Sequence, residues 1–91
     1  MIIGTVIGNI WATRKENALT GLKLMVVQRM DPADGGKYES FVAVDRVGAG
    51  IGERVLVTTG SSARMALENH GAPVDAVIVG ILDETRGREE G

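Results

Sequence analysis

The sequence predicts an all-β chain with one short helix, folded as a small five-stranded β-barrel similar to an OB-fold. Three observations support this prediction. Five runs of β-branched and other apolar residues follow one another within 91 residues, short polar or glycine-containing connections separate them, and one stretch carries serines suited to a helix cap. Short strands with turn signals between them are typical of small sandwiches and barrels. We therefore expect a closed or nearly closed antiparallel barrel.

Four of the five strands precede the helix. In the first, β-branched residues favour an extended chain, and Gly4 and Gly8 indicate a bulge or a bend. The polar stretch 14–21 is typical of a loop, and the Asp, Pro and Gly residues of 31–36 predict a turn. The four strands are expected at residues 2–12, 22–30, 40–47 and 53–59.

The helix and the last strand complete the expected barrel. Ser61 or Ser62 would cap a short helix that contains residues 64–68. An Asn-His-Gly sequence then favours the end of the helix, and Pro73 prevents its continuation. The fifth strand is expected at residues 74–82.

The fifth strand has a pattern that matters for function, because it is apolar on both of its faces. A strand with one face in water alternates apolar and polar side chains. Residues 74–82 do not alternate in this way, and neither does the run 41–44. A small barrel has a single interior, so its outer face needs a cover. A partner subunit would provide one, since large exposed apolar patches usually mark interfaces; the alternative is that the short helix covers this face.

Charge and aromatic content argue against a nucleic acid partner. Residues 83–91 hold four acidic side chains and two arginines, which accounts for the whole net charge of −2. The chain has only three aromatic residues, whereas single-stranded nucleic acid is bound by stacking aromatics along a basic groove. We expect residues 1–83 to form one domain and residues 84–91 to form a charged, flexible tail.

Composition also excludes several kinds of site. Cysteine is absent, which rules out disulfides and thiolate metal ligands, and one histidine gives no ligand spacing for a metal. The N-terminus lacks the basic region of a signal peptide, and no apolar run reaches the ~18 residues of a membrane helix. The sequence therefore predicts a cytoplasmic protein without a metal, a cofactor or a membrane partner.

Two glycine-containing loops flank the fourth strand, and neither has the pattern of a catalytic or nucleotide-binding motif. In the loop 48–52 the third glycine comes one residue too early for a dinucleotide fingerprint, and a strand follows in place of a helix. The segment 60–64 lacks the second glycine of a nucleophile elbow and has Arg64 there. His70 is the sole histidine, and nothing in the sequence brings it and an acid to Ser62. We expect no catalytic residues and no enzymatic activity.

The order and spacing of four blocks resemble a known family. These blocks begin at Gly4-Thr5-Val6, at Leu19-Thr20-Gly21, at Asp45 and at Pro73-Val74-Asp75, and the third, 45–64, is the most specific. Together they span nearly the whole chain and are similar to the EutN/CcmL family, the pentameric vertex proteins of bacterial microcompartment shells. The resemblance implies a small β-barrel in a cyclic pentamer that closes a polyhedral shell alongside hexameric shell proteins.

The resemblance also gives the two loops a role. A cyclic ring joins one patch of a subunit to a different patch of the next. Small residues allow backbones to crowd at a symmetry axis, so the axis or pore loop is expected at Gly48, Ala49, Gly50, Ile51 and Gly52. The subunit interface is expected at Thr59, Gly60, Ser61, Ser62, Ala63 and Arg64. The alternative function is a small OB-like module that binds a ligand or nucleic acid.

Overall fold

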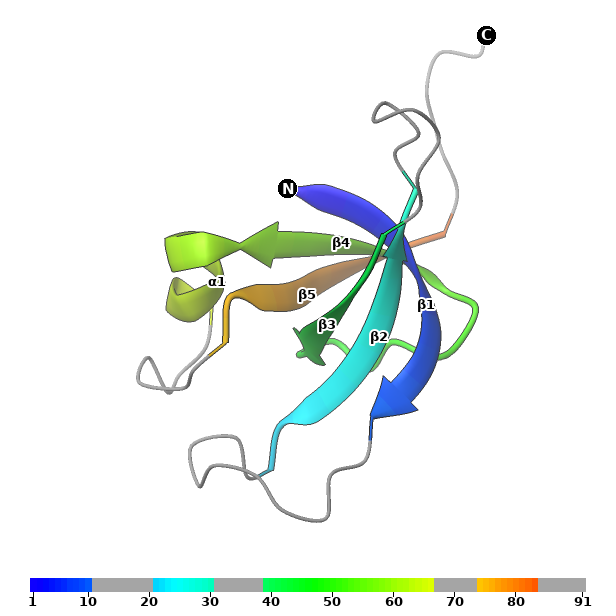
Figure 1. The fold of residues 1–91 in the computed structure, drawn as a ribbon, viewed down its shortest axis with the longest axis horizontal. Helices are drawn as coiled ribbons and strands as arrows, with labels where there is room; N and C mark the ends of the chain where they lie inside the picture. Colours follow the sequence, from blue (N-terminus) through cyan, green and yellow to red (C-terminus); the bar gives the residue numbers. More distant parts are fainter. Residues whose placement is uncertain (11–20, 31–38, 67–73, 84–91) are drawn as a thin grey trace, which may run out of the picture.

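The computed structural model confirms the all-β prediction, and Figure 1 shows strands curled around a common centre with one helix at the end of β4. It describes residues 1–10, 21–30, 39–66 and 74–83. The elements are β1 (Ile2–Ile10), β2 (Lys23–Arg29), β3 (Ser40–Asp45), β4 (Arg54–Thr59), α1 (Gly60–Met65) and β5 (Ala76–Leu82).

The strands close into a barrel in the order β1-β2-β3-β5-β4, with β4 returning to β1. Four of the neighbouring pairs are antiparallel, but β3 and β5 are parallel, pairing Val44 with Val77 and Asp45 with Ile78. The prediction of an antiparallel barrel is therefore wrong for this pair. The reason is the connection: β4 and α1 lie between the two strands in the chain, and such a crossover allows β5 to run in the same direction as β3.

The boundaries of several elements differ from the expected ones by one or two residues. The third strand ends at Asp45, and the fifth begins at Ala76. The helix begins at Gly60, so Ser61 and Ser62 lie inside it and the predicted serine cap is wrong. Gly60 has a φ of +67°, which lets the chain turn from strand to helix at once. Residues 67–73 and 84–91, including the expected helix end and the tail, lie outside the described residues.

Glycines in β1 serve two different purposes. The pairing with β2 shifts between Val6 and Gly8, so the bulge predicted in this strand is confirmed near Gly8. Gly4 marks instead a close approach of two strands. A Cβ on Gly4 would lie 2.5 Å from Val27 Cγ1 and 2.7 Å from the backbone oxygen of Gln28, whereas a Cβ on Gly8 would meet nothing within 4 Å.

The barrel interior is filled by one cluster of buried side chains, to which every strand contributes. Nine residues of this cluster are at most 4% exposed, and Met25 and Ile78 are the largest of them. Together with the closed ladder, this cluster gives the single subunit a buried core of its own. The cluster consists of Val6, Met25, Val27, Ala43, Ala49, Val55, Val57, Ala76 and Ile78.

A second cluster lies on the outer wall, beneath α1. Val44 and Val77 are fully buried there against Ala63 of the helix. The expectation that a partner subunit must cover this part of the outer wall is therefore wrong, and the alternative of a helix cover is confirmed for Val44 and Val77. The helix is short, however, and it leaves other outward-facing apolar residues uncovered.

Candidate functional site

The first candidate site is the glycine loop, residues 46–53, which connects β3 to β4. Gly48 and Gly52 have φ values of +80° and +93°. Residues that have a Cβ rarely adopt a positive φ, so the path of the loop itself requires glycine at these two positions. Gly50 has no positive φ, and a Cβ there would lie 3.5 Å from Glu53 Oε1, an ordinary contact. The fold thus explains two of the three glycines, and Gly50 is open to another explanation.

Asp45 holds the first half of the glycine loop. Its Oδ1 accepts hydrogen bonds from the backbone N–H groups of Val47 and Gly48, at 2.9 and 3.1 Å. The Nζ of Lys23 lies 3.5 Å from Asp45 Oδ2 and 3.4 Å from the backbone oxygen of Ala49, to which it donates. This ion pair was not predicted from sequence, because Lys23 and Asp45 meet only through the register of β2 with β3.

The second half of the loop is held separately. Glu53 Oε1 accepts from the backbone N–H of Gly50 at 2.6 Å, and the Glu53 N–H donates to the oxygen of Gly50 at 3.1 Å. The loop also pairs with β1, because Gly52 N–H donates to the oxygen of Val6 and Val6 N–H donates to the oxygen of Glu53. The loop is therefore fixed at both ends, although much of its surface faces water.

The five residues expected near the axis thus lie together in a rigid loop, with opposite environments for its two larger side chains. Ala49 is 1% exposed and belongs to the barrel core, whereas Ile51 is 64% exposed. Burial of Ala49 anchors the loop in the barrel. Exposure of Ile51 places an aliphatic side chain at the surface, where a contact with another molecule would remove it from water.

The second candidate site is the turn from β4 into α1, residues 59–64. Gly60 N–H donates to the oxygen of Asp75 at 2.9 Å, which ties the turn to the start of β5. Ala63 faces the outer-wall cluster and is fully buried, whereas Ser61 and Ser62 are exposed. Ala63 is therefore a packing residue of the subunit itself, and the serines are free to face a neighbour. The side chain of Arg64 lies outside the described part of the structure.

The two candidate sites lie at opposite ends of β4, as Figure 1 shows. The strand has six residues, and at about 3.4 Å per residue it separates the sites by roughly 17 Å. Residues 54–57 of β4 pair with β1, and the whole strand pairs with β5, where the register shifts between Leu56 and Val57. The structure thus brings the two sites onto one rigid element without bringing them together.

A third surface, the outer apolar row, was predicted from sequence only in part, through the run 41–44, which is apolar on both faces. We define it as Ile7, Val26 and Val42, on three adjacent strands. Val26 pairs with Val42 across β2 and β3, and Ile7 lies in the β1 bulge next to Gly8, the partner of Val26. Ile7 and Val42 are each 46% exposed. The next row across the same strands is polar, with Thr5, Gln28 and Ser40 in register, so the apolar row has a sharp edge.

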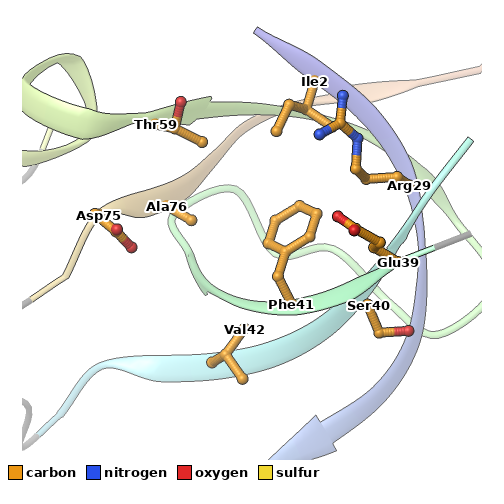
Figure 2. Close-up of a pocket in the computed structure, with 9 residues that line it drawn as sticks. All are labelled: Ile2, Arg29, Glu39, Ser40, Phe41, Val42, Thr59, Asp75 and Ala76. Atoms are coloured by element: carbon orange, nitrogen blue, oxygen red, sulfur yellow. The ribbon is translucent and has the colours of Figure 1, made fainter. Parts of the chain in front are cut away.

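A cavity of about 260 Å³ opens at one end of the barrel, where β3 and β5 separate beyond their short pairing. Figure 2 shows the ring of Phe41 projecting into it, with Arg29 and Glu39 on one side and Thr59 and Asp75 on the other. Among the described residues, the lining contains no histidine, cysteine or lysine.

The described ranges also lack a metal-binding cluster and a membrane-spanning helix. These contain no group of three or more His, Cys, Asp or Glu side chains that could hold a metal ion. The same ranges contain no helix that is long and apolar enough to cross a membrane. His70 lies outside them.

Comparisons with known proteins identify the family. Residues 1–83 match the family model described as "Ethanolamine utilisation protein EutN/carboxysome". Over 84 residues the chain is 40% identical to the bacterial microcompartment shell vertex protein EutN of Escherichia coli K12, covering 92% of this chain and 88% of the relative. Over 83 residues it is 43% identical to the carboxysome shell vertex protein CcmL of Synechococcus elongatus, covering 91% of this chain and 84% of the relative.

Solved structures agree with this assignment. The pentameric microcompartment shell protein GrpN from Rhodospirillum rubrum matches with a TM-score of 0.78 and 42% identity, over 93% of this chain and 98% of that one. An ethanolamine utilization protein, EutN, matches with a TM-score of 0.82 and 40% identity, over 93% and 88% of the two chains. The resemblance inferred from four sequence blocks is therefore confirmed: this chain belongs to the EutN/CcmL family.

Proposed function

We propose that this chain is a structural protein of a bacterial microcompartment shell, where cyclic pentamers of it occupy the vertices and close the polyhedron. Its curated relatives are named shell vertex proteins, and two of its structural neighbours are described as pentameric shell proteins. These relatives favour the shell function over the alternative of an OB-like ligand- or nucleic-acid-binding module. The shell lies in the bacterial cytoplasm, and the role is architectural, without catalysis.

Within the structure of this chain, the outer apolar row is the observation that supports the proposal. The interior is already packed, so Ile7, Val26 and Val42 contribute nothing to the core of the single subunit. About half of the Ile7 and Val42 side chains remains in water, at a cost of roughly 25 cal/mol for each Å² of apolar surface. Contact with a neighbouring subunit would remove that cost, and a domain of this size gains stability by association.

The positions of the two loops fit a ring. Neighbours in a ring meet through two different patches, which each subunit must present in a fixed relation. The glycine loop and the β4–α1 turn lie at opposite ends of β4, a strand that pairs with β1 and with β5, which gives them a defined relation. We place residues 48–52 near the five-fold axis and residues 59–64 at the seam between neighbours. Hexameric shell proteins are the expected outer partners of the ring.

The first experiment measures the mass of the purified protein by native mass spectrometry or light scattering at micromolar concentration. A pentamer is the expected result, and electron microscopy would show rings of five-fold symmetry. A stable, folded monomer would contradict the shell function. Co-expression with hexameric shell proteins then tests closure, with closed particles expected in place of tubes or open sheets.

The second experiment tests the placement of the glycine loop, and it uses the absence of cysteine from the chain. Ile51→Cys places one thiol on the exposed tip of the loop in each subunit. If five such tips converge at an axis, mild oxidation will link subunits into disulfide dimers on a non-reducing gel. Ser61→Cys at the other end of β4 is the matched control and is expected to give a different yield. If the Ile51→Cys variant is pentameric but forms no disulfide-linked dimer, the placement of the loop at the axis is wrong.

The third experiment tests the seam. Arg64→Ala shortens a side chain at the proposed seam without altering the glycine turn, and we expect the pentamer to dissociate at a higher protein concentration. Mass photometry over a dilution series measures this midpoint. A dissociation profile identical to that of the unmodified protein would contradict the placement of residues 59–64.

A further inference from the structure

We propose that Asp45 and Lys23 act as positioning residues that hold the first half of the glycine loop in the shape which neighbouring subunits contact. This inference rests on the proposed function, because it assumes that the loop meets other copies. The proposed function concerns the assembly of subunits, whereas this inference concerns the order of the loop within each subunit. Neither residue belongs to the loop segment 48–52, and both lie at the ends of strands on the adjacent wall.

The first observation is the burial of the Asp45 carboxylate, whose side chain is only 1% exposed. A buried charge is costly unless it is paired or hydrogen-bonded. Oδ1 is satisfied by the two loop N–H groups, those of Val47 and Gly48. These two consecutive donors turn onto one oxygen at the point where Gly48 adopts its positive φ. The carboxylate thus stabilises the sharp bend that begins the loop.

The second observation is the position of the Lys23 ammonium. It lies 3.5 Å from Asp45 Oδ2, which has no hydrogen-bond partner among the described residues, and it donates to the backbone oxygen of Ala49 at 3.4 Å. Lys23 is therefore positioned to neutralise the buried carboxylate and to hold the loop one residue further along. Between them, the two side chains reach the backbone of three successive loop residues, Val47, Gly48 and Ala49.

The third observation is that Asp45 and Lys23 contact only the first half of the glycine loop. The second half of the loop is fixed by Glu53 and by the pairing with Val6, without either Asp45 or Lys23. Loss of the pair should therefore loosen residues 47–49 and leave the barrel ladder intact. In the wild-type loop, Ala49 lies in the core and Ile51 is exposed at the surface. Such order lowers the entropy cost of association, because the loop is already in its bound shape.

Hydrogen–deuterium exchange of the assembled protein, read over peptides that span the loop and over strand peptides, tests the proposal. Asp45→Ala removes the acceptor of two amides, and we expect exchange in residues 46–49 to rise about ten-fold or more, as for other lost bonds to a charged group. Exchange in β1 and β4 should stay unchanged. Glu53→Ala is the matched control, and its effect should be confined to Gly50.

Two further variants separate the acceptor from the charge. Asp45→Asn keeps an oxygen for the amides of Val47 and Gly48 but loses the ion pair, and Lys23→Met loses the ion pair and the bond to Ala49. We expect Asp45→Asn to lose part of the loop protection, less than Asp45→Ala loses, and we expect both variants to dissociate at a higher protein concentration than the wild type. Because one pair is involved, the double variant should dissociate little more readily than Lys23→Met alone. These variants also keep the test valid should Asp45→Ala fail to fold.

Three results would overturn the proposal. Unchanged loop exchange in Asp45→Ala would show that the carboxylate does not hold the loop. A uniform rise of exchange across all strands would show that Asp45 serves general stability instead. Faster loop exchange with an unchanged dissociation midpoint would break the link to neighbouring subunits. A wild-type chain that is monomeric would contradict the proposed function and the contact with neighbours. The difference in loop exchange between Asp45→Ala and the wild type would then still test whether Asp45 orders the loop within one subunit.

Discussion

Gly4 provides the sharpest test of how this barrel closes. In Gly4→Ala the new Cβ would lie 2.5 Å from Val27 Cγ1 and 2.7 Å from the backbone oxygen of Gln28, in a ladder where Gly4 is paired on both sides. The valine methyl can rotate away, but the backbone oxygen cannot move without disturbing the β1–β2 pairing. Such overpacking costs about 1–3 kcal/mol, and the loss of glycine freedom in the unfolded chain returns only about 0.4–1 kcal/mol.

We therefore expect Gly4→Ala to be less stable than the wild type by about 1–2 kcal/mol, which for a chain of this size lowers the Tm by about 10 °C. Gly8→Ala is the matched control in the same strand, because its Cβ would meet nothing within 4 Å. It should have a stability equal to or slightly above that of the wild type. Thermal and urea unfolding would be compared at one protein concentration, since association adds to apparent stability. A Gly4→Ala variant as stable as the wild type would refute the reasoning.

Three other predictions follow from the same structure. Gly60→Ala should lower the unfolding free energy by about 1–2 kcal/mol, since φ is +67° there; equal urea midpoints would contradict this. Met25→Ala, at a fully buried position, should cost about 2–5 kcal/mol, whereas Met65→Ala, at a position 76% exposed, should cost little. Val42→Asp should raise the dissociation midpoint of the ring while leaving the circular dichroism spectrum unchanged, and an undiminished ring would exclude the outer apolar row from the interface.

Much of the fold could be predicted because its signals are local. β-Branched runs and turn residues located all five strands, and glycines with positive φ were found in both of the glycine-containing connections that flank β4. The parallel pairing of β3 with β5 was missed, since strand direction depends on how the chain crosses the barrel. The cover of Val77 was assigned to a neighbour for a related reason: a pattern shows that a face is apolar, but only the fold shows that Ala63 lies over it.

The candidate sites were predicted less completely than the fold. The sequence located both loops, and glycine content was the signal in each. It gave no sign of the Lys23–Asp45 pair, whose members are separated by 22 positions and meet through strand register. Of the outer apolar row, the sequence indicated only Val42, in the run 41–44 that is apolar on both faces; Ile7 and Val26 join it through strand register. The placement of the two loops in a ring stays a prediction.

The position of β4 has a consequence for the curvature of a shell. On the proposed arrangement, the axial contact lies just before the first residue of β4 and the lateral contact lies at and beyond its last. Residues 54–57 pair on both edges, with β1 and with β5, so the tilt between adjacent subunits would be a property of the barrel and not of flexible connections. Inserting a single amino acid into β4 would reverse the faces of everything beyond it, and the angle at which five copies meet would be lost along with the fold.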